Sequence, residues 1–392
     1  MHSVPDASLW LLGLAAAFAA LALTGGLSLR LRLSAAPGYL LGGVLLGSVI
    51  DIPDIFLHIL TTIGSMLILF FLGLEFSPRS LGSNMKRLTA PALWDGFINI
   101  PIAFAAAHWL GMSLLASGLF AISAYATSSA VVAKGLMDNR LLAMPEAELC
   151  LGILVIEDLV MALLLPLSVL FLYSTGVDLA GQLMKLAIAF GFVALIVAVI
   201  LFLQRPVARW LMQPAKDLTI LASLAMLFLV AGVGESSGVS AAVGALLAGM
   251  AVAESGSRKD VEELLLPHRE LLAVGFFASI GAGSDLRAII EAMPVILALA
   301  LVTFASKLLS GYLGGKSIGM PPIACIRTGI LLTPRGEFTL VAAALAIMQP
   351  WGETFYSTVV GYVIVSAIAG AIAIRYNAPM GSKLLALLTG ER

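Results

Sequence analysis

Two adjacent carboxylic acids, Glu157 and Asp158, lie in the middle of an otherwise uncharged apolar stretch that runs from Leu149 to Leu172. A stretch of this length can cross a bilayer as a helix. A charge near the centre of such a helix costs at least about 2.5 kcal/mol, so carboxylates at this depth mark ion pathways. Since a partly dehydrated carboxylate can hold either a proton or a cation, the pair indicates ion exchange. A solvated pair at a helix end is the alternative.

Two further stretches place polar or helix-breaking residues at membrane depth. The predicted span 114–137 contains a hydroxyl-rich segment around Thr127, and the predicted span 320–348 contains Thr333-Pro334-Arg335-Gly336-Glu337. Proline lacks an N–H and glycine is a poor helix former, so we expect this second helix to unwind. Irregular backbone at this depth must be buried in protein or line a water-filled cavity. The groups expected to replace water around an ion are Thr127, Ser128 and the backbone near Thr333.

Three more charges lie at or near membrane depth. Lys307 falls within the predicted span 291–314, where it either reaches the cytoplasmic interface or pairs with Glu157. Arg335 and Glu337 are two residues apart in the expected break. We expect the charges of Arg335 and Glu337 to balance each other and the dipoles of the broken helix rather than to bind the ion.

The composition bounds the class of protein. The chain has 392 residues, of which 60% are hydrophobic and 11% charged. Soluble domains carry about 25% charged residues, so the composition predicts a polytopic membrane protein in contact with lipid. The net charge of −1 gives no support for a nucleic-acid partner. The sequence contains no HExxH or CxxC metal motif, and we expect neither an enzyme nor a bound cofactor.

Thirteen apolar spans set the predicted topology. They lie near 9–29, 37–50, 55–75, 90–110, 114–137, 148–173, 181–203, 217–234, 238–254, 268–284, 291–314, 320–348 and 354–374. All but four of the 22 Lys and Arg residues fall in connections on one side; the exceptions are Lys185, Arg287, Lys307 and Arg335. By the positive-inside rule that side is cytoplasmic, so we expect the amino terminus outside and the carboxy terminus inside.

The chain also repeats itself weakly at a constant spacing. Leu40-Leu41-Gly42-Gly43 aligns with Leu246-Leu247-Ala248-Gly249, Phe70-Phe71 with Phe276-Phe277, and Thr127-Ser128-Ser129 with Thr333-Pro334-Arg335. An odd number of spans separates equivalent helices, which inverts the second copy, as in many secondary transporters. We therefore expect one all-α membrane domain over residues 1–392, with two crossed discontinuous helices. Its parts are repeat one at about 9–173, a linker helix at 181–203, repeat two at about 217–374 and a short cytoplasmic tail at 376–392.

Several of these segments resemble those of a known family. Gly38-Tyr39-Leu40-Leu41-Gly42-Gly43, Leu69-Phe70-Phe71-Leu72-Gly73-Leu74-Glu75, Ala126-Thr127-Ser128-Ser129-Ala130, Glu157-Asp158 and Gly336-Glu337-Phe338 are similar, in this order, to segments of Kef-type and Kht-type monovalent cation:proton antiporters. The resemblance implies a homodimer with a dimerisation domain and a six-helix core that moves like an elevator. It implies that Asp158 binds the monovalent cation or the proton, and that Lys307 pairs with an acidic residue. Glu157 is a departure, because bacterial sodium/proton relatives have Asp at that position and glutathione-gated potassium relatives have Gln.

The resemblance also bears on regulation and substrate. Kef-type proteins usually continue into a cytoplasmic nucleotide-binding domain, which we do not expect here because only 376–392 follows the last span. Kht-type relatives work with a separate soluble partner and exchange potassium for protons. We therefore expect a K⁺/H⁺ antiporter of the bacterial inner membrane with a separate cytoplasmic regulatory subunit.

Three other functions are weighed against this expectation. A Na⁺/H⁺ antiporter of the same fold stays open. A buried titratable pair disfavours an uncoupled cation channel. A carrier of organic anions would need a cationic or aromatic cluster, for which only Lys307 and Arg335 are available.

Overall fold

The computed structural model describes residues 7–31, 35–50, 52–75, 85–172, 191, 215–236, 241–255 and 257–389, and the regular structure in these ranges is helical. The helices are α1 (Ala7–Arg30), α2 (Ala36–Val49), α3 (Asp54–Glu75), α4 (Met85–Trp109), α5 (Leu114–Tyr125), α6 (Ser129–Asp138), α7 (Pro145–Leu172), α9 (Lys216–Ser236), α10 (Ala241–Ser255), α11 (Arg258–Ala282), α12 (Leu286–Glu291), α13 (Met293–Ser317), α14 (Pro322–Leu331), α15 (Glu337–Ala346), α16 (Gly352–Arg375) and α17 (Asn377–Thr389). The predicted all-α class is confirmed for these residues.

The helices follow the predicted spans closely where both can be compared. Six helices in the described ranges are long and apolar enough to cross a membrane: those within α1, α4, α9, α11, α13 and α16. The predicted linker 181–203 lies outside the described residues, apart from residue 191. The count of thirteen spans and the inverted repeat therefore stay predictions.

The chain leaves helical geometry at both places where a broken helix was expected. Residues 126–128, called here the first break, separate α5 from α6. Residues 332–336, called here the second break, separate α14 from α15. The backbone N–H of Ser128 donates to the Pro334 carbonyl at 2.8 Å. The two breaks therefore lie against each other, although about two hundred residues of chain separate them.

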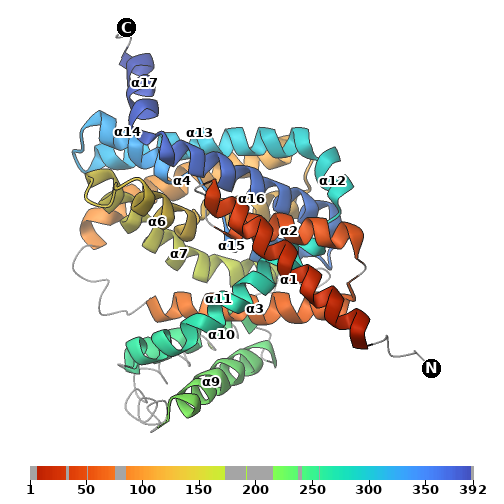
Figure 1. Cartoon of the computed structure of the whole chain (residues 1–392). Coiled ribbons are helices and arrows are strands. Elements are labelled where there is room, and N and C mark those ends of the chain that lie inside the picture. Colours follow the sequence, from red (N-terminus) through yellow and green to blue (C-terminus); the bar gives the residue numbers. More distant parts are fainter. Residues whose placement is uncertain are drawn as a thin grey trace.

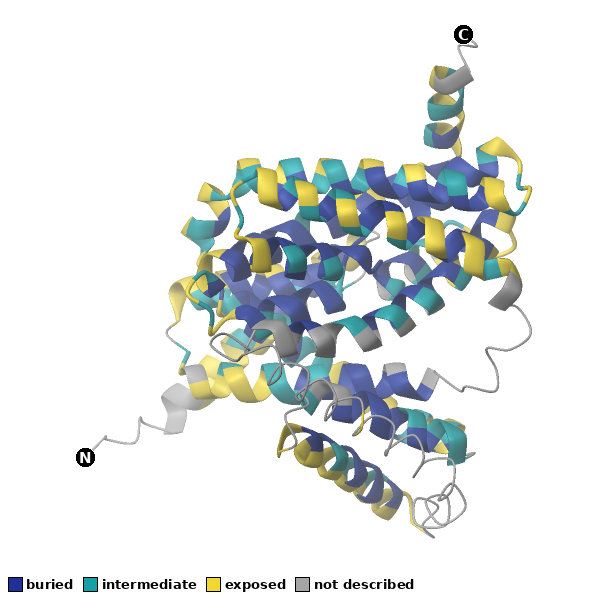
Figure 2. Cartoon of the chain, turned by 180° about the vertical axis from the view of Figure 1, so that it is seen from behind, coloured by how far each residue is buried: buried dark blue, intermediate teal, exposed yellow. Residues whose placement is uncertain are grey.

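The helices form two groups, of which α9 and α10 belong to the lower one in Figure 1 and the helices of the two breaks belong to the upper one. A hydrophobic cluster joins α3, α9, α10 and the first half of α11. A larger cluster joins α4, α5, α13, α15 and α16, and it also receives buried residues from α2, α3, α7, α10, α12 and the second half of α11. Buried residues are concentrated where the helices of this second group face one another (Figure 2).

Two helix crossings depend on glycine. A Cβ at Gly73 of α3 would collide with the carbonyl of Leu246 in α10, and a Cβ at Gly249 of α10 would collide with the carbonyl of Phe70 in α3. The crossing of α2 and α11 is built in the same way around Gly43. Small residues let helix backbones approach closely in membranes, so these positions fix the two crossings.

One helix was not anticipated from the sequence. The segment expected as a tail folds into α17, which follows α16 after a single turn residue. Met380, Leu384 and Leu385 of α17 pack against a cluster that contains Ile326 and Ile330 of α14. α17 extends away from the other helices (Figure 1), and its base is attached to the helix that leads into the second break.

Candidate functional site

A fully buried ammonium group lies between two fully buried carboxylates. The Nζ of Lys307 (α13) donates to Oδ2 of Asp95 (α4) at 2.8 Å and to Oε1 of Glu157 (α7) at 2.7 Å. The same Nζ lies 5.1 Å from the centre of the Tyr125 ring, within the range of a cation–π interaction. Buried charges are retained only when they are paired and hydrogen-bonded, and here each one is. Of the two positions considered for Lys307, the structure shows the one that pairs with Glu157.

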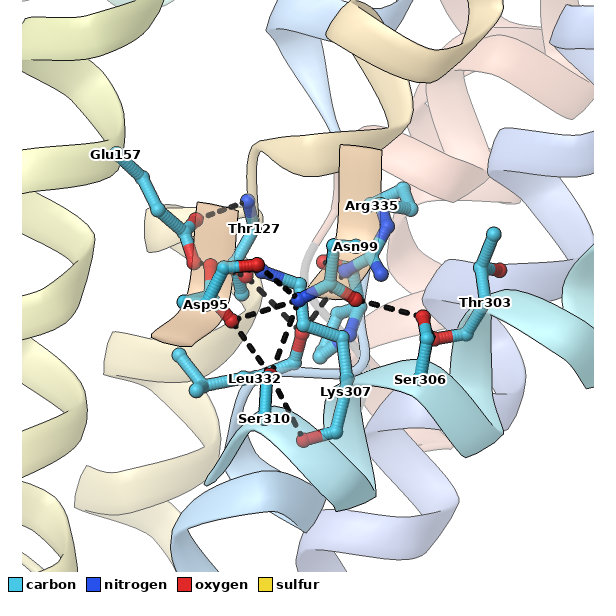
Figure 3. Close-up of polar contacts among 11 residues, drawn as sticks. Asp95, Asn99, Thr127, Glu157, Thr303, Ser306, Lys307, Ser310, Leu332 and Arg335 are labelled. Carbon is cyan, nitrogen blue, oxygen red and sulfur yellow. Dashed lines mark hydrogen bonds and ion pairs between the residues drawn. The ribbon is translucent and has the colours of Figure 1, made fainter. Parts of the chain in front are cut away.

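The Asp95 carboxylate is held by groups of two continuous helices. Its Oδ1 accepts from the Ser310 hydroxyl at 2.7 Å and from the Asn99 amide at 2.8 Å. Asn99 also donates to Ser310 at 3.0 Å and accepts from Ser306 at 2.6 Å. These contacts form a continuous polar seam between α4 and α13 (Figure 3). Asp95 is thus fixed by neighbours that do not belong to either break.

The Glu157 carboxylate, in contrast, is held by the first break. Its Oε2 accepts from the backbone N–H of Thr127, and its Oε1 accepts from the Thr127 hydroxyl at 3.1 Å. The same hydroxyl lies 3.0 Å from the carbonyl oxygen of Leu332 in the second break. A threonine hydroxyl has one proton, so it donates fully to only one of these acceptors at a time. Thr127 therefore connects the state of the Glu157 carboxylate to the backbone of the second break.

The second break carries a buried guanidinium. Arg335 is 1% exposed, and its Nη1 donates to the Leu332 carbonyl at 2.8 Å. Leu332 follows the last residue of α14, where unpaired carbonyls make the helix end negative, so a cation there is stabilising. No ion pair joins Arg335 to Glu337 among the residues that the structure describes. The Glu337 carboxylate is placed 3.5 Å from the Ser129 hydroxyl instead.

The remaining predicted site residues are close to this centre. Asp158 is 5% exposed and follows Glu157 on α7. Successive residues of an α-helix point about 100° apart, so Asp158 leaves α7 in a different direction from Glu157. Ser128 is the N-cap residue of α6. Thr333 of the second break is buried, and its hydroxyl donates to the Ile330 carbonyl near the end of α14 at 2.8 Å.

Sequence reasoning missed the polar seam of this centre: Asp95, Asn99, Ser306 and Ser310. A signal was present, because an acidic residue inside the predicted span 90–110 is followed four positions later by an amide. Residues four apart lie on the same face of a helix. The spacing therefore predicts a polar face on this span, although it does not identify what that face contacts.

The fold and the site together define the class of protein. An all-helical membrane protein with charged groups buried beside crossed helix breaks is built as secondary transporters are. A family model described as "Sodium/hydrogen exchanger, transmembrane" matches residues 16–375. The chain therefore belongs to the sodium/hydrogen exchanger family, and the resemblance to cation:proton antiporters is confirmed.

Individual proteins agree with this assignment. The chain is 29% identical to the "K(+)/H(+) antiporter subunit KhtU" of Bacillus subtilis, over 79% of this chain and 76% of that protein. It is 28% identical to the "Ammonium/H(+) antiporter subunit AmhT" of Alkalihalophilus pseudofirmus, over 92% and 91% of the two chains. The solved structure of the sodium proton antiporter MjNhaP1 from Methanocaldococcus jannaschii superposes with a TM-score of 0.72 at 16% identity, over 96% and 99% of the chains. At this low sequence identity, the similarity to MjNhaP1 is evidence for a shared fold alone.

Proposed function

We propose that this protein exchanges a monovalent cation, foremost K⁺, for H⁺ across the bacterial inner membrane, and that Glu157 and Asp158 form its ion site. The observation that supports this proposal most directly is the buried carboxylate pair on α7, one member of which is bonded to Lys307 and to the first break. The names of KhtU and AmhT favour K⁺ and ammonium as cations. The family description keeps Na⁺ as the alternative cation.

The chemistry follows from competition for the same carboxylate oxygens. With protons bound, the carboxylates are neutral and the site can cross the membrane without a cation. With protons released to the other side, the carboxylates attract a cation, and hydroxyls and carbonyls of the breaks replace part of its hydration shell. We assign the carrier role to Asp158, with Thr127, Ser128 and the backbone near Thr333 supplying oxygens. Glu157 tunes or shares this load: its bond to Lys307 neutralises part of its charge, and its oxygens become available to the cation when the ammonium leaves.

The alternating movement is part of the same proposal. We propose an elevator-like shift of the group around α4, α5, α13 and α15 relative to the group around α3, α9 and α10. The glycine crossings support the inverted repeat behind this division. The repeat equates α2 with α10 and α3 with α11, so the α2–α11 crossing at Gly43 has its counterpart in the α3–α10 crossing at Gly249.

Assembly and orientation complete the proposal. We propose a homodimer with the amino terminus outside and the carboxy terminus in the cytoplasm, as the charge distribution predicts. A separate cytoplasmic regulatory subunit is supported by the names of KhtU and AmhT, which are both called subunits.

The test is proton movement in proteoliposomes, followed by dequenching of a pH-sensitive dye when K⁺, Na⁺, Li⁺ or NH₄⁺ is added across a range of pH. We expect cation-dependent proton movement in the wild type and none in Asp158→Asn. Substantial exchange by that variant would overturn the assignment of Asp158. The matched control is Asp217→Asn, which removes an exposed carboxylate of α9 and should retain full exchange. Cation flux without linked proton movement would indicate a channel.

A further inference from the structure

Asp95 contributes a third buried carboxylate close to the proposed ion site, and the function proposed above does not use it. We infer that Asp95 is a positioning residue that retains Lys307 when Glu157 releases the ammonium to bind a transported cation. This inference rests on the proposed exchange function. It concerns the step in which the cation replaces the ammonium at Glu157, whereas the exchange itself rests on Asp158.

The two ion pairs of Lys307 differ in how they are built. Asp95 lies on α4 and Lys307 on α13. Neither helix is broken, and the polar seam through Asn99 and Ser310 holds the two helices together. A Cβ at Gly314 of α13 would lie only 3.2 Å from Pro91 of α4, so the two helices are also closely packed one turn from the seam. Glu157 belongs to α7, and Thr127 of the first break holds it. The Asp95–Lys307 pair can therefore persist while the surroundings of Glu157 change.

Because the two ion pairs differ, the Lys307 ammonium can keep one carboxylate partner when a cation binds to Glu157. A cation that binds to Glu157 competes with the Lys307 ammonium for the same oxygen. Without another anion, the displaced ammonium would be a buried and unpaired charge, which is strongly unfavourable. Asp95 is already bonded to Lys307 at 2.8 Å, so the ammonium keeps one carboxylate and the Tyr125 ring after it leaves Glu157. Cation binding then breaks one contact of Lys307 rather than its whole environment.

The first measurement is the dependence of exchange on K⁺ concentration in Asp95→Asn. Asparagine has nearly the same size but carries no charge, so Lys307 is left with Glu157 as its carboxylate partner. Since the cation must then displace the ammonium from its last bonded anion, we expect KM for K⁺ to rise about ten-fold or more, with a smaller change in the maximal rate. Asp95→Glu keeps the charge and should restore most of the affinity. A lower maximal rate at unchanged KM would overturn the inference, because a purely structural role acts in that way.

The second measurement asks whether Asp95 acts through Lys307. K⁺ binding to purified protein is measured as K⁺-dependent thermal stabilisation, which does not require turnover. In a Lys307→Met background the ammonium is absent, so adding Asp95→Asn should no longer weaken K⁺ binding. An equal loss of affinity in both backgrounds would show that Asp95 acts on the cation directly and would overturn the inference.

The control and the two modes of failure are separable. Thr303→Val removes a buried hydroxyl of α13 that bonds Tyr362 at 2.9 Å, one turn from Lys307 and outside the seam. It should leave KM for K⁺ unchanged, so a shift equal to that of Asp95→Asn would overturn the role of the seam. If the wild type shows no cation-dependent proton movement, the proposed function fails. If the wild type shows cation-dependent proton movement but Asp95→Asn binds K⁺ with the wild-type affinity, only the inference about Asp95 fails.

Discussion

The two helix breaks have opposite hydrogen-bonding roles. The first break donates: the N–H and hydroxyl of Thr127 bond Glu157, and the N–H of Ser128 bonds the second break. The second break accepts: the carbonyl of Leu332 receives the Thr127 hydroxyl and the Arg335 guanidinium, and the carbonyl of Pro334 receives the Ser128 N–H. Each break thus satisfies backbone groups that the other exposes, as buried polar groups require.

This difference divides the site into two functions. The first break contacts the α7 carboxylate directly, so a change there should alter the binding of the cation. The second break contacts the first break and its own arginine, so a change there should alter how the two breaks fit. Arg335 supplies a fixed positive charge beside the accepting carbonyls, whereas no charged residue occurs in the first break. Three substitutions test this division.

The largest effect is expected at the contact between the breaks, in Gly336→Ala. The new Cβ would lie 2.5 Å from Oγ and 2.6 Å from Cβ of Ser128. Overpacking of this kind costs about 1–3 kcal/mol, and the breaks would be forced apart. We expect a lower melting temperature and a loss of exchange of about ten-fold or more, measured by thermal unfolding in detergent and in proteoliposomes.

Two companion variants show whether the crossing causes that loss. Ser128→Gly removes the atoms that the new methyl group would strike, so adding it should recover part of the stability of Gly336→Ala. Gly232→Ala in α9 adds the same methyl group where no atom lies within 4 Å, and it should behave as the wild type. Equal damage in both alanine variants would contradict a specific fit between the breaks.

A smaller effect is expected at the carboxylate contact, in Thr127→Val. Valine keeps the size of the side chain and the backbone N–H bond to Glu157, but it lacks the hydroxyl shared by Glu157 and Leu332. A single hydrogen bond contributes about 0.5–1.5 kcal/mol, so we expect KM for K⁺ to rise about two- to ten-fold with little change in melting temperature. Thr127→Ser retains the hydroxyl and should resemble the wild type. If serine and valine have the same effect, the hydroxyl is not what matters.

Much of this site could be predicted because its signals are local. A carboxylate pair inside an apolar span, a hydroxyl-rich segment and a proline two residues before a glycine are all visible in a short window. These three signals predict Glu157, the first break and the second break. The burial of Lys307 was one of two alternatives that the sequence left open, since its distance from the interface depends on where α13 ends.

The part that could not be predicted depends on packing between distant helices. Asp95 meets Lys307 across more than two hundred residues of chain, and their distance is set by how closely α4 and α13 approach at Pro91 and Gly314. The expected balance between Arg335 and Glu337 relied on their proximity in the chain. In the structure the Arg335 guanidinium donates to the Leu332 carbonyl at the end of α14, so it balances that helix dipole as expected, whereas it forms no ion pair with Glu337 within the described residues.

The smallest effect is expected in Ser129→Ala, which removes another side-chain contact between the two broken helices. The Ser129 hydroxyl lies 3.5 Å from Glu337, well beyond the optimum of about 2.7–2.8 Å for such a bond. Glu337 lies in the first turn of α15, where the helix dipole stabilises its charge whether or not serine is present. We expect a change below about 0.5 kcal/mol in stability and no measurable shift in KM for K⁺. Ser129 and Thr127 both carry hydroxyls and lie two positions apart. If Ser129→Ala raises KM for K⁺ as much as Thr127→Val does, the hydroxyls near the first break act by making the site polar and not through a specific hydrogen bond. If KM for K⁺ rises in Thr127→Val alone, the hydroxyl that bonds Glu157 is the one that supports cation binding.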